Sequence, residues 1–314
     1  MRAVTIRDQQ LSVEEHPDPT PGSGEVLVRV RAAGLNGADM IQLRGAYPAP
    51  AGSPPDIPGL ELAGEVIARG PGAARFSPGD RVMGIVGGGG QAELATVHER
   101  VLMAVPGNLS WAEAGGVPEV FTTAHDAVFT QAGLVLGERL LVHAGAGGVG
   151  TAAIGLGRAA GARITATVRN PALRDEVAQL GATVIEPEGF AEHGPFDVIL
   201  ELVGAINLGE NLNALQIGGR IVVIGTGAGA KGEINLGLLM GKRARIHGST
   251  LRARPLEGKA LTARAVERSV LPLLATGSVK VPIARSYPLA EAPAAYEHFA
   301  AGGKLGKIIL ELGG

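Results

Sequence analysis

Residues 145–150 read GAGGVG, the G-x-G-x-x-G spacing of a loop that holds the pyrophosphate of a dinucleotide cofactor. Gly145 would permit the tight turn, Gly147 would let the backbone approach the phosphates, and Gly150 would let the next helix pack closely on the strand. The N-terminus of that helix would add N–H donors and a favourable dipole. We therefore expect cofactor contacts along the whole loop, which comprises Gly145, Ala146, Gly147, Gly148, Val149 and Gly150. A glycine-rich turn without a ligand is the alternative interpretation.

The residues after the second strand of the expected nucleotide fold indicate which cofactor binds. NAD-dependent proteins place Asp or Glu there, about 20 residues beyond the loop, to bond the ribose 2′-hydroxyl. This chain has Arg169 and Asn170 instead, with Arg174 nearby. Because an arginine suits a 2′-phosphate, the sequence predicts NADPH. If both arginines are only solvated surface residues, NADH remains open.

The elements that must position this loop alternate between strands and helices. We expect strands at residues 139–143, 164–168, 183–185, 197–202, 220–224 and 245–248, and helices at 149–160 and 171–180. Six short strands separated by helical segments predict an α/β fold with a doubly wound, six-stranded parallel sheet.

The segments on either side are β-rich. Alternating apolar and charged residues at 25–31 predict a half-buried strand. Further strands are expected at 62–68, 82–86, 281–289 and 307–311, and a helix from 255 to 275. We expect residues 1–115 and 255–314 to form one β-rich domain, and residues 116–254 to form a Rossmann domain inserted into it.

Length, charge and cysteine content exclude several classes of protein. A chain of 314 residues accommodates about two domains. The net charge of −2 gives no basic footprint for nucleic acid. The absence of cysteine excludes disulfides and Cys-ligated metal. Charged residues interrupt the most apolar stretch, residues 134–164, so no membrane span is expected. The first ten residues lack a signal-type apolar run, and we expect a cytoplasmic protein.

Several short segments match the motifs of one family. They are LNGAD at 35–39, RGAYP at 44–48, PGLE at 58–61, PEVFTTA at 118–124 and GKI at 306–308. With the glycine loop, they make the chain resemble the zinc-independent quinone oxidoreductases (zeta-crystallin-like) of the medium-chain dehydrogenase/reductase superfamily. It looks closest to the tumour-suppressor-inducible quinone oxidoreductase subgroup. The resemblance runs nearly end to end, and it implies a GroES-like domain with an inserted Rossmann domain, NADPH as the hydride donor and a homodimer.

The same resemblance bears on metal binding. Zinc alcohol dehydrogenases of the superfamily have a Cys ligand where this chain has Asn36, and a His ligand where it has Leu60. Without a Lewis acid, alcohol oxidation is disfavoured, whereas a quinone or enone accepts a hydride with modest help at its oxygen. The seven histidines are scattered without ligand-like spacing. We expect no metal.

Hydride addition to a quinone or enone builds negative charge on oxygen, so hydrogen-bond donors must lie nearby. Asn36 could offer its amide to substrate or cofactor, Tyr47 its phenol, and Thr123 its hydroxyl to the nicotinamide carboxamide. Their structural alternatives are turn capping, packing under a Pro-rich loop, and helix capping. The resemblance implies further cofactor contacts after the later strands and in the closing Gly-Lys motif, at Gly204, Gly225, Thr226, Gly227, Ser249, Thr250, Leu251 and Lys307. For Lys307 an exposed surface charge is the alternative.

Two departures from the family concern the adenosine end of the cofactor. Leu173 replaces the lysine of a Ser-x-x-Lys pattern, and Glu186, Pro187 and Glu188 stand where the family has a tyrosine. These glutamates would repel a 2′-phosphate if they pointed inward. They leave the choice between NADPH and NADH open.

The sequence therefore favours a zinc-independent, NADPH-dependent reductase of quinones or α,β-unsaturated carbonyl compounds. The alternative is a non-catalytic NADPH-binding protein, because some relatives of this family serve as crystallins or bind RNA. The few aromatic residues and the slightly negative charge offer no stacking surface for RNA. Turnover with a panel of acceptors separates the two hypotheses.

Overall fold

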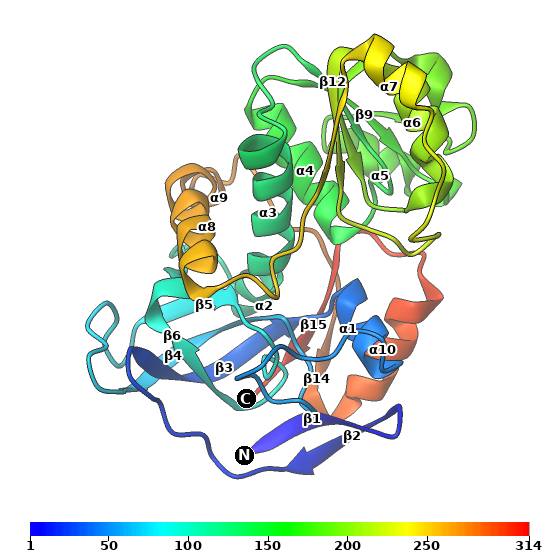
Figure 1. Cartoon of the computed structure of the whole chain (residues 1–314). Coiled ribbons are helices and arrows are strands. Elements are labelled where there is room, and N and C mark those ends of the chain that lie inside the picture. Colours follow the sequence, from blue (N-terminus) through cyan, green and yellow to red (C-terminus); the bar gives the residue numbers. More distant parts are fainter. Residues whose placement is uncertain (314) are drawn as a thin grey trace.

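The computed structural model describes residues 1–313, and its strands form two large sheets in separate lobes (Figure 1). The upper lobe contains a six-stranded sheet with the order β10-β9-β8-β11-β12-β13, in which all pairs are parallel. Its strands are β8 (Arg139–Val142), β9 (Arg163–Thr167), β10 (Thr183–Ile185), β11 (Phe196–Glu201), β12 (Leu215–Val223) and β13 (Arg245–Gly248). The prediction of an α/β fold with a six-stranded parallel Rossmann sheet is confirmed.

The central strands of this sheet are short and apolar. Three of the four residues of β8 and five of the six residues of β11 are buried. The chain moves outward from β8 to β10 and returns on the other side at β11, so the strand order reverses between β8 and β11. Doubly wound sheets bind their ligands at such a reversal, beyond the carboxyl ends of the strands.

Helices cover this sheet and connect its strands. They are α4 (Gly148–Ala159), α5 (Arg174–Gln179), α6 (Leu208–Ala214) and α7 (Leu236–Lys242), with short 3-10 turns η3 (Pro171–Leu173), η4 (Phe190–His193) and η5 (Ala205–Asn207). α4 packs closely on the sheet because Gly157 leaves room for Leu140 and Ile164. The glycine loop therefore enters a helix that is fixed against the strands.

The lower lobe contains a seven-stranded sheet with the order β14-β15-β3-β4-β5-β7, in which β6 also pairs with β3. Its strands are β3 (Glu25–Gly34), β4 (Glu61–Arg69), β5 (Arg81–Ile85), β6 (Leu94–His98), β7 (Leu102–Ala104), β14 (Ile283–Pro288) and β15 (Lys307–Glu311). β15 pairs antiparallel with β3, so this sheet joins the last strand of the chain to its third. A separate hairpin of β1 (Arg2–Arg7) and β2 (Gln10–Glu15) lies at its base.

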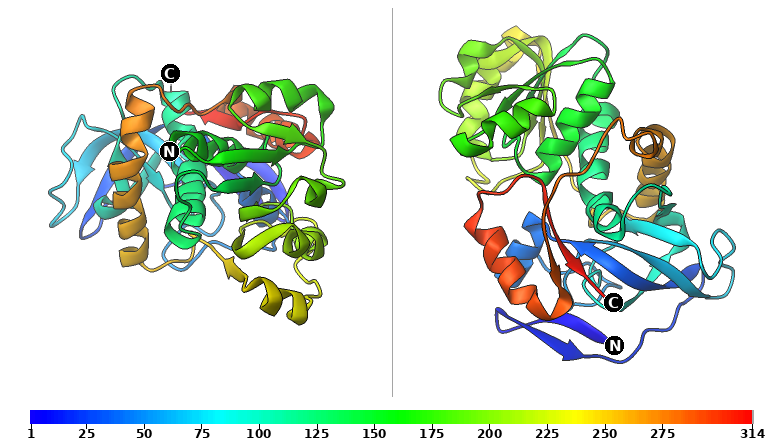
Figure 2. Two further views of the ribbon diagram at one scale, coloured as in Figure 1. Left: turned by 90° about the horizontal axis from the view of Figure 1, so that it is seen from above. Right: turned by 180° about the vertical axis from the view of Figure 1, so that it is seen from behind.

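The remaining helices pack on the lower lobe or lie between the lobes, and the views from above and behind show α3 running between them (Figure 2). They are α1 (Gly37–Leu43), α2 (Trp111–Gly116), α3 (Pro118–His125), α8 (Leu256–Ser269), α9 (Leu271–Ala275) and α10 (Ala292–Ala301), with a π-helical turn η2 (Asp126–Gln131) after α3 and the 3-10 turns η1 (Glu99–Val101) and η6 (Leu289–Glu291). One apolar cluster runs from Met83 in the lower sheet through Val120 of α3 to Val142 and Val266. The lobes thus share a core.

The expected elements differ from the observed ones in a few places. The predicted helix at 255–275 is divided into α8 and α9, because Pro272 lies in the first turn of α9 and has no N–H to continue α8. The hairpin β1–β2, the strands β6 and β7 and the helices α1, α2, α3, α6, α7 and α10 were not predicted. Among residues 1–313, no helix is long and apolar enough to cross a membrane.

Candidate functional site

The loop between β8 and α4 has the shape that a pyrophosphate site requires. A Cβ on Gly145 would approach the Cβ of Ala166 to 2.8 Å, and one on Gly150 would lie 2.5 Å from the carbonyl oxygen of Ala144. Gly147 differs, since a Cβ there would meet only that same oxygen, at 3.4 Å. No side chain caps α4, so its first N–H groups point out of the helix without an intrahelical partner. The residues present fit a dinucleotide phosphate.

The glycine loop also contacts the lower lobe directly. The N–H of Gly306 donates to the carbonyl of Ala146 at 2.9 Å, and Gly147 and Gly306 form a parallel bridge. A Cβ on Gly148 would lie 2.9 Å from Cδ of Lys307. The start of β15 is therefore fixed beneath the phosphate loop.

Lys307 and Asn36, both predicted site residues, belong to one buried network. The ammonium of Lys307 bonds Oε1 of Glu61 at 2.6 Å, and Oδ1 of Asn36 and the carbonyl of Leu35 at 2.7 Å each. The Asn36 amide nitrogen donates to Oε1 of Glu61 at 2.9 Å and to the carbonyl of Gly34 at 3.2 Å. All these donors are used within the protein, so neither side chain points a free donor at a ligand. Lys307 is 2% exposed and is not a surface charge.

Three buried carboxyl groups surround this single ammonium. Asp39 accepts from the N–H groups of Asn36 at 2.8 Å and Gly59 at 3.2 Å, and Glu61 accepts from the N–H of Glu119 at 2.7 Å. Burial raises the pKa of Asp39 to about 7. Burial, and next the charge of Glu61, raises the pKa of Glu119 to about 7. This carboxyl cluster is not predicted from the sequence, although Asp39, Glu61 and Glu119 lie in the segments LNGAD, PGLE and PEVFTTA.

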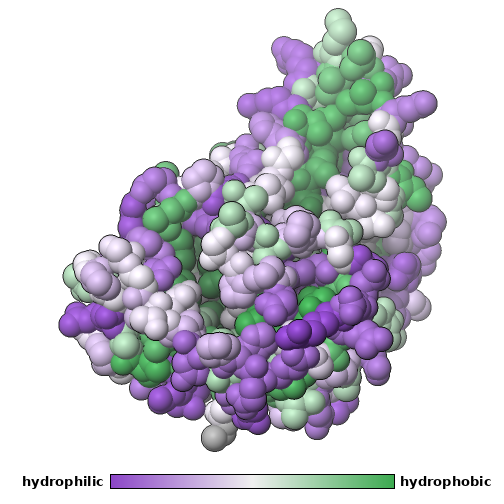
Figure 3. Space-filling view, turned by 60° about the horizontal axis from the view of Figure 1, so that its bottom comes forward, coloured by the Kyte–Doolittle hydropathy of each residue, from purple (hydrophilic) through white to green (hydrophobic). Residues whose placement is uncertain are grey.

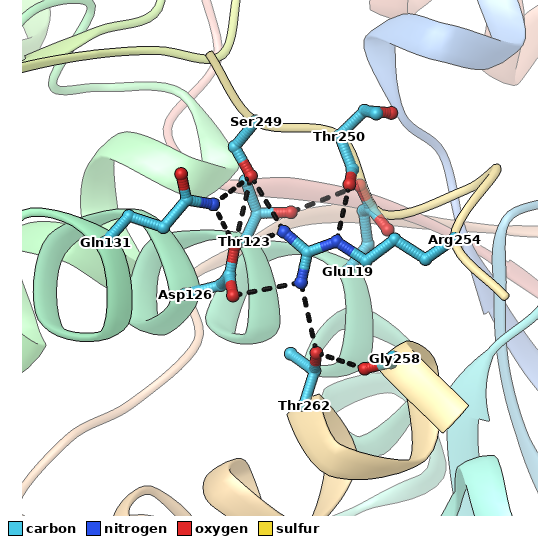
Figure 4. Close-up of polar contacts among 9 residues, drawn as sticks. All are labelled: Glu119, Thr123, Asp126, Gln131, Ser249, Thr250, Arg254, Gly258 and Thr262. Carbon is cyan, nitrogen blue, oxygen red and sulfur yellow. Dashed lines mark hydrogen bonds and ion pairs between the residues drawn. The ribbon is translucent and has the colours of Figure 1, made fainter. Parts of the chain in front are cut away.

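Thr123 lies on α3 one turn beyond Glu119. Its hydroxyl donates to Oε1 of Glu119 at 3.3 Å, whereas Oε2 of Glu119 is buried without a partner. Figure 4 draws Glu119 and Thr123 on α3 together with Thr250, which follows β13. Asp126, at the start of η2, connects the two segments by accepting hydrogen bonds from Ser249 and Arg254.

Tyr47 reaches the same place from the lower lobe. Its hydroxyl lies 3.5 Å from Oγ1 of Thr250. Arg252 fixes the Tyr47 loop, because its guanidinium donates to the carbonyls of Tyr47 at 2.9 Å and Gly87 at 2.8 Å, and to Oε1 of Gln42 at 2.6 Å. Arg252 also lies 4.8 Å over the Tyr47 ring. The partly exposed phenol is thus held near the end of β13.

A partly buried ion pair holds the segment that contains Ser249 and Thr250 (Figure 4). Arg254 contacts both oxygens of Asp126, at 3.0 and 2.6 Å, and donates to the carbonyl of Thr250 at 2.8 Å. Ser249 and Gln131 also donate to Asp126, at 3.0 and 2.7 Å. Burial alone would raise the pKa of Asp126, but the hydrogen bonds from Arg254 and Gln131 outweigh it and lower the pKa. No local sequence pattern joins residues so far apart.

The residues predicted to read the ribose have different environments. Arg169 is exposed two residues after the end of β9. Arg174 bonds Glu186 at 2.8 Å and the carbonyl of Val168 at 3.2 Å, so Glu186 is engaged by an arginine. Asn170 caps η3 by accepting from the N–H of Ala172 at 3.1 Å.

The remaining predicted cofactor contacts lie in loops after β11, β12 and β13. Gly204 has a left-handed φ of 140°, and its N–H donates to the buried Glu201 at 2.9 Å. A Cβ on Gly225 would lie 2.1 Å from the carbonyl of Leu202, so the two loops touch. Thr226 and Gly227 continue from Gly225, and Leu251 is buried after Thr250. These loops all follow the carboxyl ends of the strands, as the glycine loop does.

Leu60 is buried, and no group of three or more His, Cys, Asp or Glu side chains within residues 1–313 is arranged to hold a metal ion. His143 is buried and bonds Asn211 at 2.8 Å and Thr167 at 3.2 Å.

Known proteins resemble this chain in both lobes. The family model "Alcohol dehydrogenase GroES-like domain" matches residues 22–107, and "Zinc-binding dehydrogenase" matches residues 148–267. The acryloyl-coenzyme A reductase of Metallosphaera sedula is 30% identical, over 99% of both chains. The human quinone oxidoreductase is 30% identical, over 94% of this chain and 91% of its own. Erythronolide synthase EryA2 of Saccharopolyspora erythraea is 37% identical over 92% of this chain, which spans only 8% of that synthase.

The solved structures give the same picture. The Escherichia coli quinone oxidoreductase complexed with NADPH superposes with a TM-score of 0.87, at 25% identity, over 99% of this chain and 100% of its own.

Proposed function

Because the chain belongs to the medium-chain dehydrogenase/reductase superfamily, we propose that it is an NADPH-dependent reductase of quinones or α,β-unsaturated carbonyl compounds. One observation carries the proposal furthest. The glycine loop ends in a helix N-terminus that no side chain caps, and the space beside Gly147 is open. A dinucleotide phosphate fits that space and those N–H groups. The relatives include a quinone oxidoreductase and an acryloyl-coenzyme A reductase, which supports both acceptor classes.

NADPH is the proposed cofactor because of the residues that follow β9. Arg169 is exposed there, and no carboxylate takes the place that would bond a ribose 2′-hydroxyl. Glu186, whose carboxylate would repel a 2′-phosphate if it pointed inward, is paired with Arg174. When bound, the reduced nicotinamide would supply a hydride.

The protein's own part in the reaction is to orient the acceptor and to meet the charge that develops on its oxygen. Tyr47 is the proposed donor, since its phenol is partly exposed and lies near Thr250. Asn36 is proposed as a positioning residue, because its amide is bonded to Glu61 and Lys307. The acceptor gains the hydride and one proton, so that an enone becomes saturated or a quinone becomes a hydroquinone, and the cofactor leaves oxidised. No step requires zinc.

The test is to follow the oxidation of NADPH and of NADH by absorbance, with an ortho-quinone and a simple enone as acceptors. Loss of a charge-assisted bond to a phosphate should raise the KM for NADPH about tenfold in Arg169→Ala. Arg268→Ala, at an exposed arginine on α8, is the matched control and should leave it unchanged. Tyr47→Phe should lower kcat more than it changes the KM for NADPH.

Other outcomes correct the proposal in defined ways. Turnover with NADH alone would keep the reductase and overturn the role of Arg169. Binding of NADPH without turnover of any acceptor would favour a non-catalytic NADPH-binding protein.

We also propose that two copies of the chain form a homodimer through the edge of the six-stranded sheet. β13 pairs only with β12, so its outer edge is free among the described residues. Exposed apolar side chains lie on or near this edge, at Ile246, Leu236 and Met240. Hydrophobic surface gathers on this part of the molecule, at the upper right of the space-filling view (Figure 3).

A further inference from the structure

The carboxyl group of Glu119 has one oxygen that the surrounding protein leaves without a partner. Oε1 accepts from the hydroxyl of Thr123 at 3.3 Å (Figure 4). Oε2 is buried, and it meets no hydrogen-bond donor among residues 1–313. An ionised carboxylate would therefore leave a charged oxygen buried without a donor, which is costly. A protonated carboxyl leaves only a neutral oxygen unpaired, so the geometry favours the acid form.

The charges around Glu119 also disfavour its ionisation. Glu61, on β4, accepts from the N–H of Glu119 and takes the ammonium of Lys307, which lies at the start of β15. Asp39, on α1, adds a third carboxyl group. Arg252, after β13, is the next cation toward Glu119, but its guanidinium bonds three oxygens of which none belongs to a carboxylate. Burial, and next the charge of Glu61, raises the pKa of Glu119 to about 7.

The helix that carries Glu119 lies beside the glycine loop. A Cβ on Gly148 would lie 2.8 Å from Cγ1 of Val120, which follows Glu119, and 2.9 Å from Cδ of Lys307. Thr123, one turn further along α3, is 6% exposed. The helix thus borders the proposed cofactor site, where the sequence predicts a contact between the Thr123 hydroxyl and the nicotinamide carboxamide.

The protonation of Glu119 determines where the Thr123 hydroxyl can donate. A hydroxyl has a single hydrogen, and its oxygen can also accept. When Glu119 is ionised, that hydrogen goes to Oε1, and Thr123 can only accept from a ligand. When Glu119 is protonated, its own O–H can donate to Oγ1 of Thr123. The hydroxyl hydrogen of Thr123 is then available to a ligand oxygen.

We propose that Glu119 is a positioning residue for the cofactor, because its acid form directs the Thr123 hydroxyl to donate to the carbonyl oxygen of the nicotinamide carboxamide. The inference rests on the proposed function and adds to it a residue that acts on the cofactor through Thr123. When Glu119 is ionised, a carboxamide can turn its NH2 group toward Thr123, so NADP⁺ binds in both states. A cofactor that has only a carbonyl at this position is bonded by Thr123 only when Glu119 is protonated.

The experiment compares NADP⁺ with its 3-acetylpyridine analogue, which carries a ketone in place of the carboxamide. Calorimetry gives the dissociation constants of both ligands at pH 6 and pH 8. Their ratio cancels the ionisation of the phosphate groups, which both ligands share. The ratio of analogue to NADP⁺ should rise about fivefold from pH 6 to pH 8 in the native chain, as loss of one neutral hydrogen bond predicts. An unchanged ratio would overturn the proposal.

Three variants assign the change to Glu119 and Thr123. In Glu119→Gln the ratio should be the same at both pH values, because an amide does not titrate. Thr123→Val keeps the shape of the side chain and the Glu119 carboxyl, and it should also remove the pH dependence. Asp39→Asn is the matched control, since it removes another buried carboxyl whose pKa is about 7, and it should keep the change. Persistence of the change in Glu119→Gln or Thr123→Val would overturn the role of Glu119, and so would its loss in a folded Asp39→Asn protein.

Turnover distinguishes failure of this inference from failure of the proposed function. Reduction of a quinone or enone, together with a ratio that does not depend on pH, would overturn the positioning role and keep the reductase. The expected ratios without turnover of any acceptor would support Glu119 and Thr123 as cofactor-binding residues and overturn the reductase.

Discussion

The environment of Lys307 determines the protonation of the carboxyl groups of Asp39, Glu61 and Glu119. One ammonium faces three carboxyl groups, and it bonds Glu61 directly, at 2.6 Å. Asp39 and Glu119 lie nearby without a cation of their own, and burial raises the pKa of each to about 7. A proton therefore replaces a counter-ion at these positions below about pH 7. This protonation arises because the single ammonium of Lys307 does not neutralise Asp39 and Glu119 as well as Glu61.

Glu119→Gln tests that account through the pH dependence of stability. The folded-state pKa of Glu119 is about 7, above the ordinary value of 4.5, so the folded protein holds a proton that the unfolded chain loses between pH 4.5 and 7. Stability from this group is present below pH 4.5 and is lost as the pH rises to 7. The charges that face Glu119 are those of Glu61, Lys307 and Asp39. Glutamine removes the cost of ionisation.

The Tm of Glu119→Gln relative to the native chain should therefore rise from pH 5 to pH 8. A change of about 1–2 °C is expected for each kcal/mol of this difference in a chain of this size. Glu297→Gln, at an exposed glutamate on α10, should show the same Tm difference at both pH values. A pH-independent difference for Glu119→Gln would mean that this carboxyl titrates normally.

At the scale of elements, two glycines of the β8–α4 turn have different roles. Gly150 is required for packing, whereas Gly147 faces the proposed ligand. In Gly150→Ala the new methyl group would lie 2.5 Å from the backbone oxygen of Ala144, so we expect a lower Tm as well as weaker cofactor binding. In Gly147→Ala the nearest atom is at 3.4 Å. That variant should keep its Tm within about 1 °C and lose affinity for NADPH, measured by calorimetry and thermal unfolding. Gly37→Ala, with no atom within 4 Å of the new methyl, is the control.

These elements also show what the sequence can predict. The periodicity of apolar residues located all six strands of the parallel sheet, and β10, β13 and β15 were predicted with their observed bounds, because buried strands are short apolar runs between turn residues. The hairpin β1–β2 was missed, since its hydrophobic residues are mixed with charged ones. The glycine loop could be found because its function depends on adjacent residues.

The polar networks of the site could not be predicted in the same way. Asn36, Glu61 and Lys307 come from three separate segments, and only the antiparallel pairing of β15 with β3 and of β3 with β4 brings those segments together. The sequence therefore indicated a free amide on Asn36, where the fold engages it. The same holds for Asp126 and Arg254, which are 128 positions apart.

A double-mutant cycle tests whether that ion pair is a structural element. Asp126→Asn and Arg254→Gln should each lower the free energy of unfolding, because each leaves a partly buried charge without its partner. Arg254 is partly exposed, so a coupling of about 2 kcal/mol is expected rather than the larger values of fully buried pairs. Chemical denaturation of the four proteins measures it. Additive effects, with no coupling, would show that Arg254 is held instead by the carbonyl of Thr250, at 2.8 Å, and the hydroxyl of Thr262, at 3.2 Å.

At the scale of the whole molecule, the two lobes are joined near the site. Gly306 bonds Ala146 in the phosphate loop, Tyr47 approaches Thr250, and the apolar core continues through α3. A ligand on the glycine loop therefore contacts a surface that both lobes form. β13 is an edge strand of the upper sheet, and β11 and β12 separate it from β8. A second copy can therefore pair with the outer edge of β13 without covering the glycine loop.

Dimerisation through β13 makes a specific prediction. Ile246 lies on the free edge strand and Met240 on α7, and their side chains are 37% and 75% exposed. Ile246→Lys or Met240→Glu would place a charge in the interface, and an unpaired charge at a buried contact costs several kcal/mol. Light scattering after gel filtration should then give the monomer mass of about 31.9 kDa, against twice that for the native chain. The control is Leu261→Glu, at an apolar residue of α8 that is 69% exposed, and this variant should stay dimeric. A monomeric native chain would exclude this interface, and so would dissociation by Leu261→Glu alone.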